Sequence, residues 1–507
     1  MGVFMNVRAN LYGIFLLLST LSVNAQDAHE VLERASRAMG VDEMISIQYK
    51  GTGWVGAVGQ NFTPAMDWPR LELSSYTRTI DFDSMSSTEE LVIEQGDYPA
   101  RGGGGIPIQG QRHRTYKVRG DYAWDMQGDD IVPVMDKAEG RLLDIYLTPY
   151  GFIKGAMASD PTVIRRHEYG EWVHVVSFIA LDKYRINATF SEEGLMHRIQ
   201  TWLPNPVVGD MYYETVFSNY KDIGGLRFPG RWHQHHDFDD GDTLPNVSGG
   251  DHAFGLENIT DVTINVRGAE LDVPREVRRA DPPEIKVEVT ELSEGVWFMG
   301  GGSHNSVAIE FDEYIAVFEA PQNEARSLAV IEEIYQLIED KPIRFIINSH
   351  HHWDHLGGLR TYVHEGATVI THDYNKTYYQ EVLRARPWLL EPDRYSLFPL
   401  EEWSEGYVFE TVKEKYILAD DSHRVDIHLI QGLNHVEGML IAYLPDEKMV
   451  IEADLYSPRP SNANRPPNAS NKTFYENLKR LKLDVETIVP IHGQPTPMSQ
   501  FVEYMGE

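Results

Sequence analysis

The stretch His350-His351-His352-Trp353-Asp354-His355 (HHHWDH) gathers four histidines and a carboxylate directly after an apolar segment, residues 343–347, that is predicted to be a strand. Leu356-Gly357-Gly358 follows it and opens a predicted helix. Side chains 350 and 352 can point one way from an extended turn while those of 354 and 355 reach elsewhere. Four ligands arranged in this way serve two metal ions better than one. The side chain of residue 351 is predicted not to be a ligand.

Three further candidate ligands follow predicted strands downstream of this motif. His435 comes after the strand pattern of residues 425–429, Asp454 after that of 449–453, and His492 after that of 488–491. The chain has no cysteine, so any metal site must use His, Asp and Glu side chains, and no disulfide can form. The sequence therefore predicts a metal centre built at the ends of several strands.

The ordered set of these residues resembles the metallo-β-lactamase superfamily over residues 284–507. The resemblance implies an α/β fold, an αββα sandwich that binds two zinc ions (Zn2+). It implies that His350, His352 and His435 bind one zinc ion, that Asp354, His355 and His492 bind the second, and that Asp454 bridges both. Glu319, in Phe-Glu-Ala-Pro, matches the position of an aspartate that usually ends an early strand, and its implied role is to support a metal ligand from behind.

The resemblance implies a dinuclear zinc hydrolase. In such an enzyme a metal-bridging hydroxide attacks an ester, a lactone, a thioester or an amide, including a β-lactam, of a small-molecule substrate. We assign Asp354 a further role in orienting the hydroxide and passing a proton to the leaving group. Tyr456, two residues after Asp454, is a candidate donor to the developing oxyanion.

Two other functions are compatible with the motif. One is a mononuclear iron, persulfide-dioxygenase-like oxidoreductase, which also uses a HxHxDH turn. The nearly complete ligand set for two metals argues against it, because a single iron ion would not use all of these ligands. The other is a periplasmic binding protein with a structural metal site. Structural zinc sites are usually closed and four-coordinate, whereas this ligand count favours open positions.

The N-terminal segment predicts the location of the protein, and the net charge argues against one class of partner. Residues 1–25 resemble a cleavable signal peptide, with Arg8, an apolar core over 11–21 and Val23-Asn24-Ala25 before the predicted cleavage site. We therefore expect a periplasmic or secreted protein, cleaved after Ala25, without stable membrane insertion. Lys and Arg number 45 against 77 for Asp and Glu, a net charge of −32, which argues against nucleic acid as a partner.

Residues 26–280 are predicted to form a mostly antiparallel β domain after a helix over 27–39, and 284–507 the catalytic domain, with the boundary near Ala280-Asp281-Pro282-Pro283. Alternating patterns predict strands over 172–179, 184–190, 195–203 and 211–220, and an apolar face predicts a helix over 326–339. Residues 213–232 are faintly similar to the half-barrel of periplasmic lipoprotein carriers, which implies a module that binds an apolar ligand or positions the substrate.

Three more segments have both a functional and a purely structural interpretation. Trp232-His233-Gln234-His235-His236 places His233 and His235 on one strand face, but without a third ligand at a suitable spacing an exposed polar strand is favoured. Gly102–Gly105 is predicted to be a flexible loop and not a phosphate cradle. The bulky residues between 372 and 435 could form an apolar lid or pack ordinary helices; they include Tyr378, Tyr379, Trp388, Phe398 and Trp403.

Overall fold

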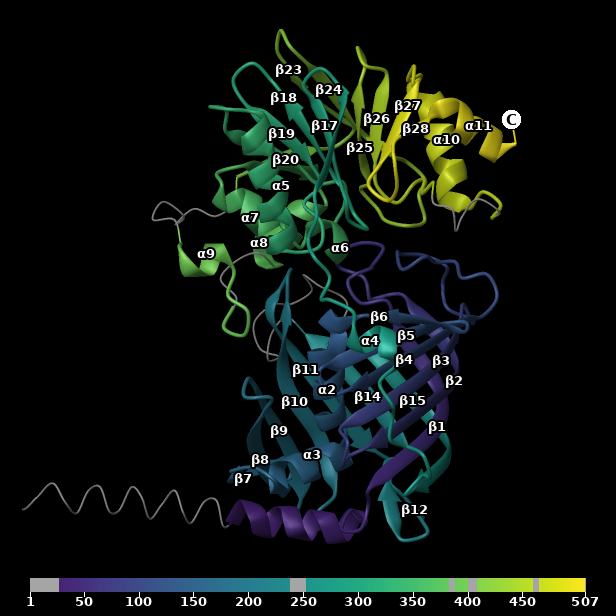
Figure 1. Ribbon diagram of the computed structural model, residues 1–507, viewed down its shortest axis with the longest axis vertical. Helices are drawn as coiled ribbons and strands as arrows, with labels where there is room; N and C mark the ends of the chain where they lie inside the picture. The colour runs from purple at the N-terminus through teal and green to yellow at the C-terminus, as the bar shows by residue number, and fades with distance from the viewer. Residues whose placement is uncertain (1–26, 238–251, 383–387, 400–407, 459–464, 507) are drawn as a thin grey trace, which may run out of the picture.

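The computed structural model describes residues 27–237, 252–382, 388–399, 408–458 and 465–506, so the signal-peptide prediction lies outside the described residues. The molecule has two lobes stacked along its long axis, the N-terminal lobe below and the C-terminal lobe above in Figure 1. Within the described ranges no helix is both long and apolar enough to cross a membrane.

The N-terminal lobe is built on one antiparallel sheet of 13 strands, ordered β6-β5-β4-β3-β2-β1-β15-β14-β11-β10-β9-β8-β7. Its strands alternate between a buried and a more open face, most regularly in β11, because successive strand side chains point to opposite faces. The strands are β1 (Ser46–Gly56), β2 (Arg70–Asp81), β3 (Ser86–Glu94), β4 (Arg112–Arg119), β5 (Tyr122–Gln127), β6 (Asp130–Pro133), β7 (Thr162–Glu168), β8 (Glu171–Ala180), β9 (Tyr184–Ser191), β10 (Met196–Asn205), β11 (Gly209–Ser218), β14 (Arg231–Asp237) and β15 (His252–Ile264).

Helices cover the buried face of this sheet. Apolar side chains of the helix at residues 27–39 and of α2 (Ala138–Tyr146) and α3 (Pro149–Met157) share one core cluster with the strands. A short turn, η1 (Met135–Lys137), precedes α2, and a separate hairpin is formed by β12 (Lys221–Ile223) and β13 (Leu226–Phe228). The faint half-barrel similarity stays a prediction.

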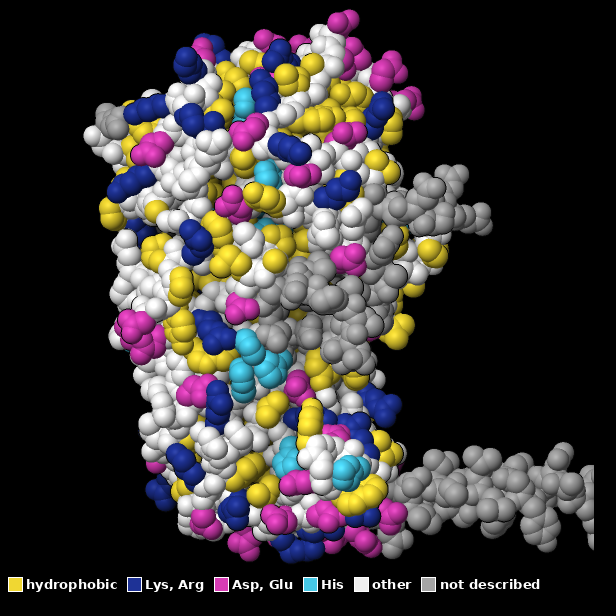
Figure 2. Space-filling model, turned by 180° about the vertical axis from the view of Figure 1, so that it is seen from behind, with side chains coloured by type: hydrophobic (Ala, Val, Ile, Leu, Met, Phe, Trp, Pro, Cys, Tyr) yellow, Lys and Arg dark blue, Asp and Glu magenta, His cyan; other side chains and the backbone are white. Residues whose placement is uncertain are grey.

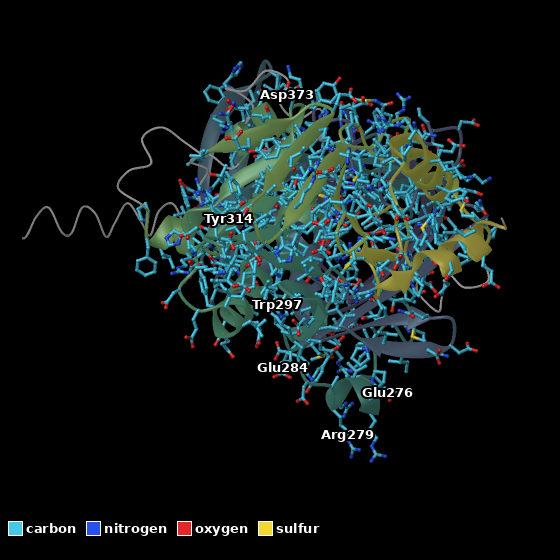
Figure 3. All side chains as sticks on the ribbon, turned by 90° about the horizontal axis from the view of Figure 1, so that it is seen from above. Glu276, Arg279, Glu284, Trp297, Tyr314 and Asp373 are labelled. Carbon is cyan, nitrogen blue, oxygen red and sulfur yellow. The ribbon has the colours of Figure 1, made fainter. Side chains whose placement is uncertain are left out.

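The segment between the lobes contains the short helix α4 (Arg275–Arg278). Seen along the long axis, Glu276 and Arg279 lie at the outer edge of the molecule (Figure 3), so this part of the connection runs over the outside.

The C-terminal lobe is a four-layer sandwich, which confirms the predicted fold class. Two sheets face each other across an apolar core that draws residues from both. The first contains β16 (Glu288–Ser293), β17 (Val296–Gly300), β18 (Ser306–Glu310), β19 (Ile315–Phe318), β20 (Ile343–Ile347), β21 (Thr368–His372) and β22 (Phe409–Val412). The second contains β23 (Lys415–Ala419), β24 (Arg424–Leu429), β25 (Leu440–Leu444), β26 (Met449–Glu452), β27 (Thr487–Pro490) and β28 (Thr496–Pro497).

Helices pack on the outer faces of both sheets. Strand β19 shows why: Ala316 and Phe318 face the core between the sheets, whereas Ile315 and Val317 join the cluster beneath the outer helices. A strand covered on both faces is apolar throughout. The first sheet is covered by α5 (Glu324–Leu337), α7 (Leu359–His364) and α8 (Asn375–Val382), with α6 (Trp353–Leu356) and α9 (Arg394–Leu397) nearby, and the second by α10 (Ala469–Leu481) and α11 (Met498–Met505).

The two lobes share apolar contacts. Trp68 and Met211 of the N-terminal lobe belong to the same buried cluster as Trp353 and Tyr378 of the C-terminal lobe. The indole Nε1 of Trp353 donates to the Tyr378 hydroxyl at 2.8 Å, and Tyr379 is fully buried. These two tyrosines are therefore helix-packing residues, while Trp403 of the predicted lid lies outside the described residues.

Candidate metal centre

Two groups of metal-ligating side chains meet at the edge of the sandwich that faces the N-terminal lobe. The motif after β20 supplies residues to both groups, and the loops after β17, β24, β26 and β27 supply the others. The first group is His350, His352, His435 and Asp454, and the second is His304, Asp354, His355 and His492. In each group, one ligand atom of every residue lies within 4.8 Å of the others.

Asp454 connects the two groups. Its Oδ2 lies 2.8 Å from Nε2 of His435 and 3.2 Å from Nε2 of His355, and its Oδ1 lies 2.7 Å from Nε2 of His492. Oδ2 thus lies against histidines of both groups, and a carboxylate in this position can bridge two cations, because each oxygen has more than one lone pair. The geometry thus matches the bridging role that the resemblance implies for Asp454.

His304 is a member of the second group that the sequence did not indicate. Its Nε2 lies 3.2 Å from Oδ2 of Asp354, and its ring centroid lies 4.1 Å from that of His492. His304 directly follows Gly301-Gly302-Ser303, the glycine-rich turn after β17. The sequence feature that could have indicated His304 is its position directly after a strand and a glycine turn. His435 and His492, which are predicted as ligands, also follow strands.

The imidazoles are held by hydrogen bonds on the side that faces away from the centre. Nδ1 of His350 contacts the Ser349 hydroxyl at 2.8 Å, Nε2 of His352 lies 2.9 Å from the Asn61 carbonyl oxygen, and Nδ1 of His492 lies 3.1 Å from the Ser303 carbonyl oxygen. A proton fixed on that nitrogen leaves the opposite nitrogen with a lone pair for a metal ion. The donor set therefore fits divalent metal ions.

Glu319 holds His355 in the same way. Its Oε2 lies 2.7 Å from Nδ1 of His355, and its Oε1 accepts a hydrogen bond of 2.6 Å from the Ser349 backbone N–H. Both side chains are fully buried. The carboxylate keeps the His355 proton on Nδ1 and turns Nε2 toward Asp454, which is the supporting role expected for this position.

Burial and charge set the protonation states of the centre. Burial lowers the pKa of His350 to about 3 and that of His304 to about 4, so both imidazoles are neutral at pH 7, the form that binds metal. Burial alone would raise the pKa of the Asp354 and Asp454 carboxyls, but the neighbouring His355 charge holds both well below their usual range.

The pKa of His355 moves the other way. Burial lowers it, but the carboxylates of Asp454, Asp354 and Glu319 together raise it well above its usual value. A metal ion that binds Nε2 of His355 must therefore displace a proton from it.

Loops of the N-terminal lobe reach this centre, as the loops rising toward α6 in Figure 1 illustrate. Nε2 of Gln60 donates to Oδ1 of Asp354 at 2.8 Å, and the Trp353 backbone N–H donates to the Gly59 carbonyl. Gly103 lies so close that a Cβ there would stand 2.7 Å from Cε1 of His352. The prediction that Gly102–Gly105 is only a flexible loop missed this contact.

A polar pocket of about 470 Å³ opens beside the centre, between the two lobes. Asp454 and Tyr456 line it from the C-terminal lobe, together with Arg465, and Arg112 lines it from the N-terminal lobe. The Tyr456 ring packs against Phe501 at 4.6 Å between centroids, and burial raises the pKa of its hydroxyl. Its role as an oxyanion donor stays a prediction.

Two remaining histidine predictions have different outcomes. His351 is fully buried, packs against His352 and Tyr378, and belongs to neither ligand group. The statement that no third ligand accompanies His233 and His235 is wrong, because β15 brings His252 beside them. Strand pairing, which local spacing does not encode, supplies this third residue.

Comparison with known proteins identifies the C-terminal lobe. Residues 299–492 match the family model described as the metallo-beta-lactamase superfamily, so this part of the chain is a domain of that superfamily, with the fold of its metal-dependent hydrolases. The resemblance inferred from the motif is confirmed for this half of the chain. No curated protein sequence matches the chain.

Several solved structures are similar to the chain. A metallo-beta-lactamase from Pontibacter korlensis is 16% identical and covers 44% of this chain and 98% of its own, with a TM-score of 0.33. The metallo-beta-lactamase FIM-1 from Pseudomonas aeruginosa, in a mono-zinc form, is 16% identical and covers 45% and 96%, with a TM-score of 0.34. A flavodiiron protein from Giardia intestinalis is 16% identical and covers 44% and 59%, with a TM-score of 0.33.

Proposed function

We propose that this chain, whose residues 299–492 form a metallo-beta-lactamase superfamily domain, is a hydrolase that uses two zinc ions to cleave an ester, lactone, thioester or amide bond of a small molecule. The observation that carries the proposal is the position of Asp454, whose two oxygens contact histidines of both ligand groups. A carboxylate that reaches both groups of histidines favours a site for two metal ions.

The residues of the chain would hold the ions as the two groups indicate. His350, His352 and His435 would bind one ion, the second group would bind the other, and Asp454 would bridge them. When bound, two such ions supply Lewis acidity and make water nucleophilic near neutral pH. The two carboxylates offset part of the cationic charge.

Asp354 is the residue best placed to handle a proton. Its side chain is 38% exposed, more than that of any histidine paired with it, and Gln60 and His304 each fix one of its oxygens. With both oxygens oriented, the carboxylate can accept a proton from the attacking water and return it to the leaving group. We expect Asp354→Asn to lower kcat by about 100- to 10,000-fold.

We further propose that the substrate carries an anionic group, which the pocket beside Asp454 binds. Arg112 and Arg465 line this pocket, and burial and then the charges of Arg114 and Arg465 lower the pKa of Arg112. Among the described residues the Arg112 guanidinium donates to the carbonyl oxygens of Gly104 and Gly105, the latter at 2.9 Å, and forms no ion pair with a carboxylate. Two close cations in a chain of net charge −32 favour an anion between them.

The hydrolase proposal is tested on purified protein. Metal content is measured after purification without added metal, and activity is then followed with chromogenic esters, lactones, thioesters, β-lactams, phosphodiesters and sulfate esters. Chelation should abolish hydrolysis, and about two equivalents of zinc should restore it. About one iron and no zinc would contradict the proposal and favour the mononuclear iron oxidoreductase. Failure to hydrolyse any substrate, with His352→Ala unable to fold, would favour a binding protein with a structural metal.

The anion proposal is tested with a matched pair of variants on β4. Arg112→Gln should raise KM about tenfold or more for a substrate with a carboxylate and change KM little for its neutral methyl ester. Lys117→Gln, on the opposite face of the same strand and outside the pocket lining, should leave both values unchanged. Equal effects on the charged and neutral substrates would refute the anion proposal and leave the hydrolase proposal intact.

The site of action is also a proposal, based on residues 1–25. Expression of the full chain in a bacterial host should give a periplasmic or secreted protein whose first residue is Gln26. An intact N-terminus in the cytoplasm would contradict it.

A further inference from the structure

A third cluster of histidines lies in the N-terminal lobe, outside the centre described above. His233 and His235 are two residues apart on β14 and therefore point to the same face of the sheet. The neighbouring strand β15 pairs with β14 in antiparallel register, with His252 opposite His235 and Gly255 opposite His233. Figure 2 shows histidine side chains gathered on this face of the lower lobe.

The three imidazoles are close enough to share one ligand. Their ring centroids are separated by 4.5 Å, 4.8 Å and 5.0 Å, and one nitrogen of each lies within 4.8 Å of the others. Nε2 of His233 is buried and makes no hydrogen bond.

The surroundings shape a site around these rings. The Trp54 indole stands edge-on to His233 at 5.6 Å, and its Nε1 donates to Glu257. Gly255 makes room for this indole, because a Cβ at that position would lie 2.3 Å from Nε1 of Trp54. On the other side, Oε2 of Glu214 lies 3.7 Å from Nδ1 of His235, where it can orient the imidazole.

We propose that His233, His235 and His252 bind a third metal ion, a divalent transition metal of the zinc class. Three imidazoles are a donor set that suits zinc, copper or nickel ions and does not suit magnesium or calcium ions. Three histidines also leave a coordination position for water or for a carboxylate, as open zinc sites do.

The position of this site gives it a structural role. His236, the next residue on β14, packs against Trp68, which packs against Trp353 in the HHHWDH motif. A metal ion bound across β14 and β15 would tie together the two strands that carry this contact between the lobes. Because the ion binds only the folded protein, it should also raise the melting temperature.

The test compares variants of the full-length protein by metal content and melting temperature. Wild-type protein loaded with zinc and desalted should retain about one equivalent more zinc than His233→Asn or His252→Asn. Both variants should keep the hydrolytic activity of the wild type, because neither residue belongs to the catalytic groups. His197→Asn, on β10 of the same sheet, is the matched control and should retain all the zinc.

Two results would overturn the proposal. One is equal zinc retention in the wild type and both variants; the other is zinc that is lost from all proteins on desalting, with no change in melting temperature. Crystals of the wild-type protein grown with zinc provide a measurement that needs no variant. An anomalous peak among the three histidines supports the proposal, and peaks confined to the catalytic centre contradict it.

Discussion

Replacing Glu319 with glutamine tests whether a buried carboxylate behind His355 tunes one of the two metal groups. The variant keeps the size of the side chain and one acceptor oxygen, but it removes the negative charge 2.7 Å from Nδ1 of His355. If the amide oxygen serves His355, the amide NH2 must face the Ser349 N–H, which is also a donor. If the amide NH2 faces His355, the imidazole must move its proton to Nε2 and loses its metal-binding lone pair.

The expected cost follows from these alternatives. Loss of a hydrogen-bonding partner behind a metal ligand typically lowers affinity about 10- to 100-fold, which corresponds to about 1.4–2.7 kcal/mol. The loss should fall on the group that contains His355. The group of His350, His352 and His435 should keep its affinity, because no hydrogen bond or ion pair of Glu319 with these side chains is present.

Competition with a chromogenic chelator separates the two groups. Wild-type protein should release zinc in two phases, one for each ligand group. Glu319→Gln should lower the zinc affinity in one of these phases and leave the other phase unchanged. Glu319→Asp, which keeps the charge, should lie between the wild type and Glu319→Gln. Equal weakening of both phases, or unchanged affinity together with a folded structure by circular dichroism, would refute the reasoning.

Three further outcomes are expected. Gln60→Ala should lower kcat about 10- to 100-fold with zinc content unchanged, since it removes a hydrogen bond to the ionised Asp354; unchanged kcat would contradict this. Gly59→Ala should lower the free energy of unfolding in urea by about 1–3 kcal/mol more than Gly110→Ala. Both glycines have positive φ, but only a Cβ at residue 59 would clash with a side chain, the Trp353 indole. Equal losses in the two variants would exclude the clash. Burial lowers the pKa of His236 to about 4, below the 6.5 of the unfolded chain, so its contribution to stability should fall between pH 6.5 and pH 4. The free energy of unfolding of wild-type protein in urea should therefore fall by up to about 2 kcal/mol more from pH 7 to pH 5 than that of His236→Gln. Equal decreases in the two proteins would contradict this prediction.

The local patterns of the sequence predicted the strands and helices well where burial is periodic. The strands predicted over 172–179 and 184–190 are β8 (Glu171–Ala180) and β9 (Tyr184–Ser191), and the helix predicted over 326–339 is α5, which begins and ends two residues earlier. The order of the 13 strands could not be read in this way. Strand β1 pairs with β15, and no local periodicity records a partner that is some two hundred residues away.

The same distinction applies to the site. Residues of the HHHWDH motif and the later ligands each follow an apolar strand, which is a local signal. Gln60 and Asn61 contact Asp354 and His352 although they lie about 290 residues earlier in the sequence. The composition of their loop indicates only a turn. His252 joins His233 and His235 for the same reason, because sheet pairing brings them together.

The hydrogen bond from His352 to the Asn61 carbonyl makes the N-terminal lobe part of the metal-binding equilibrium. Any factor by which docking of the two lobes strengthens zinc binding must equal the factor by which zinc strengthens docking, because the two events form a closed thermodynamic cycle. A molecule that separates the two lobes would then release metal even if it contacted none of the metal-ligating side chains. Separation of the lobes would therefore lower the affinity of the centre for metal without any competing metal-binding molecule.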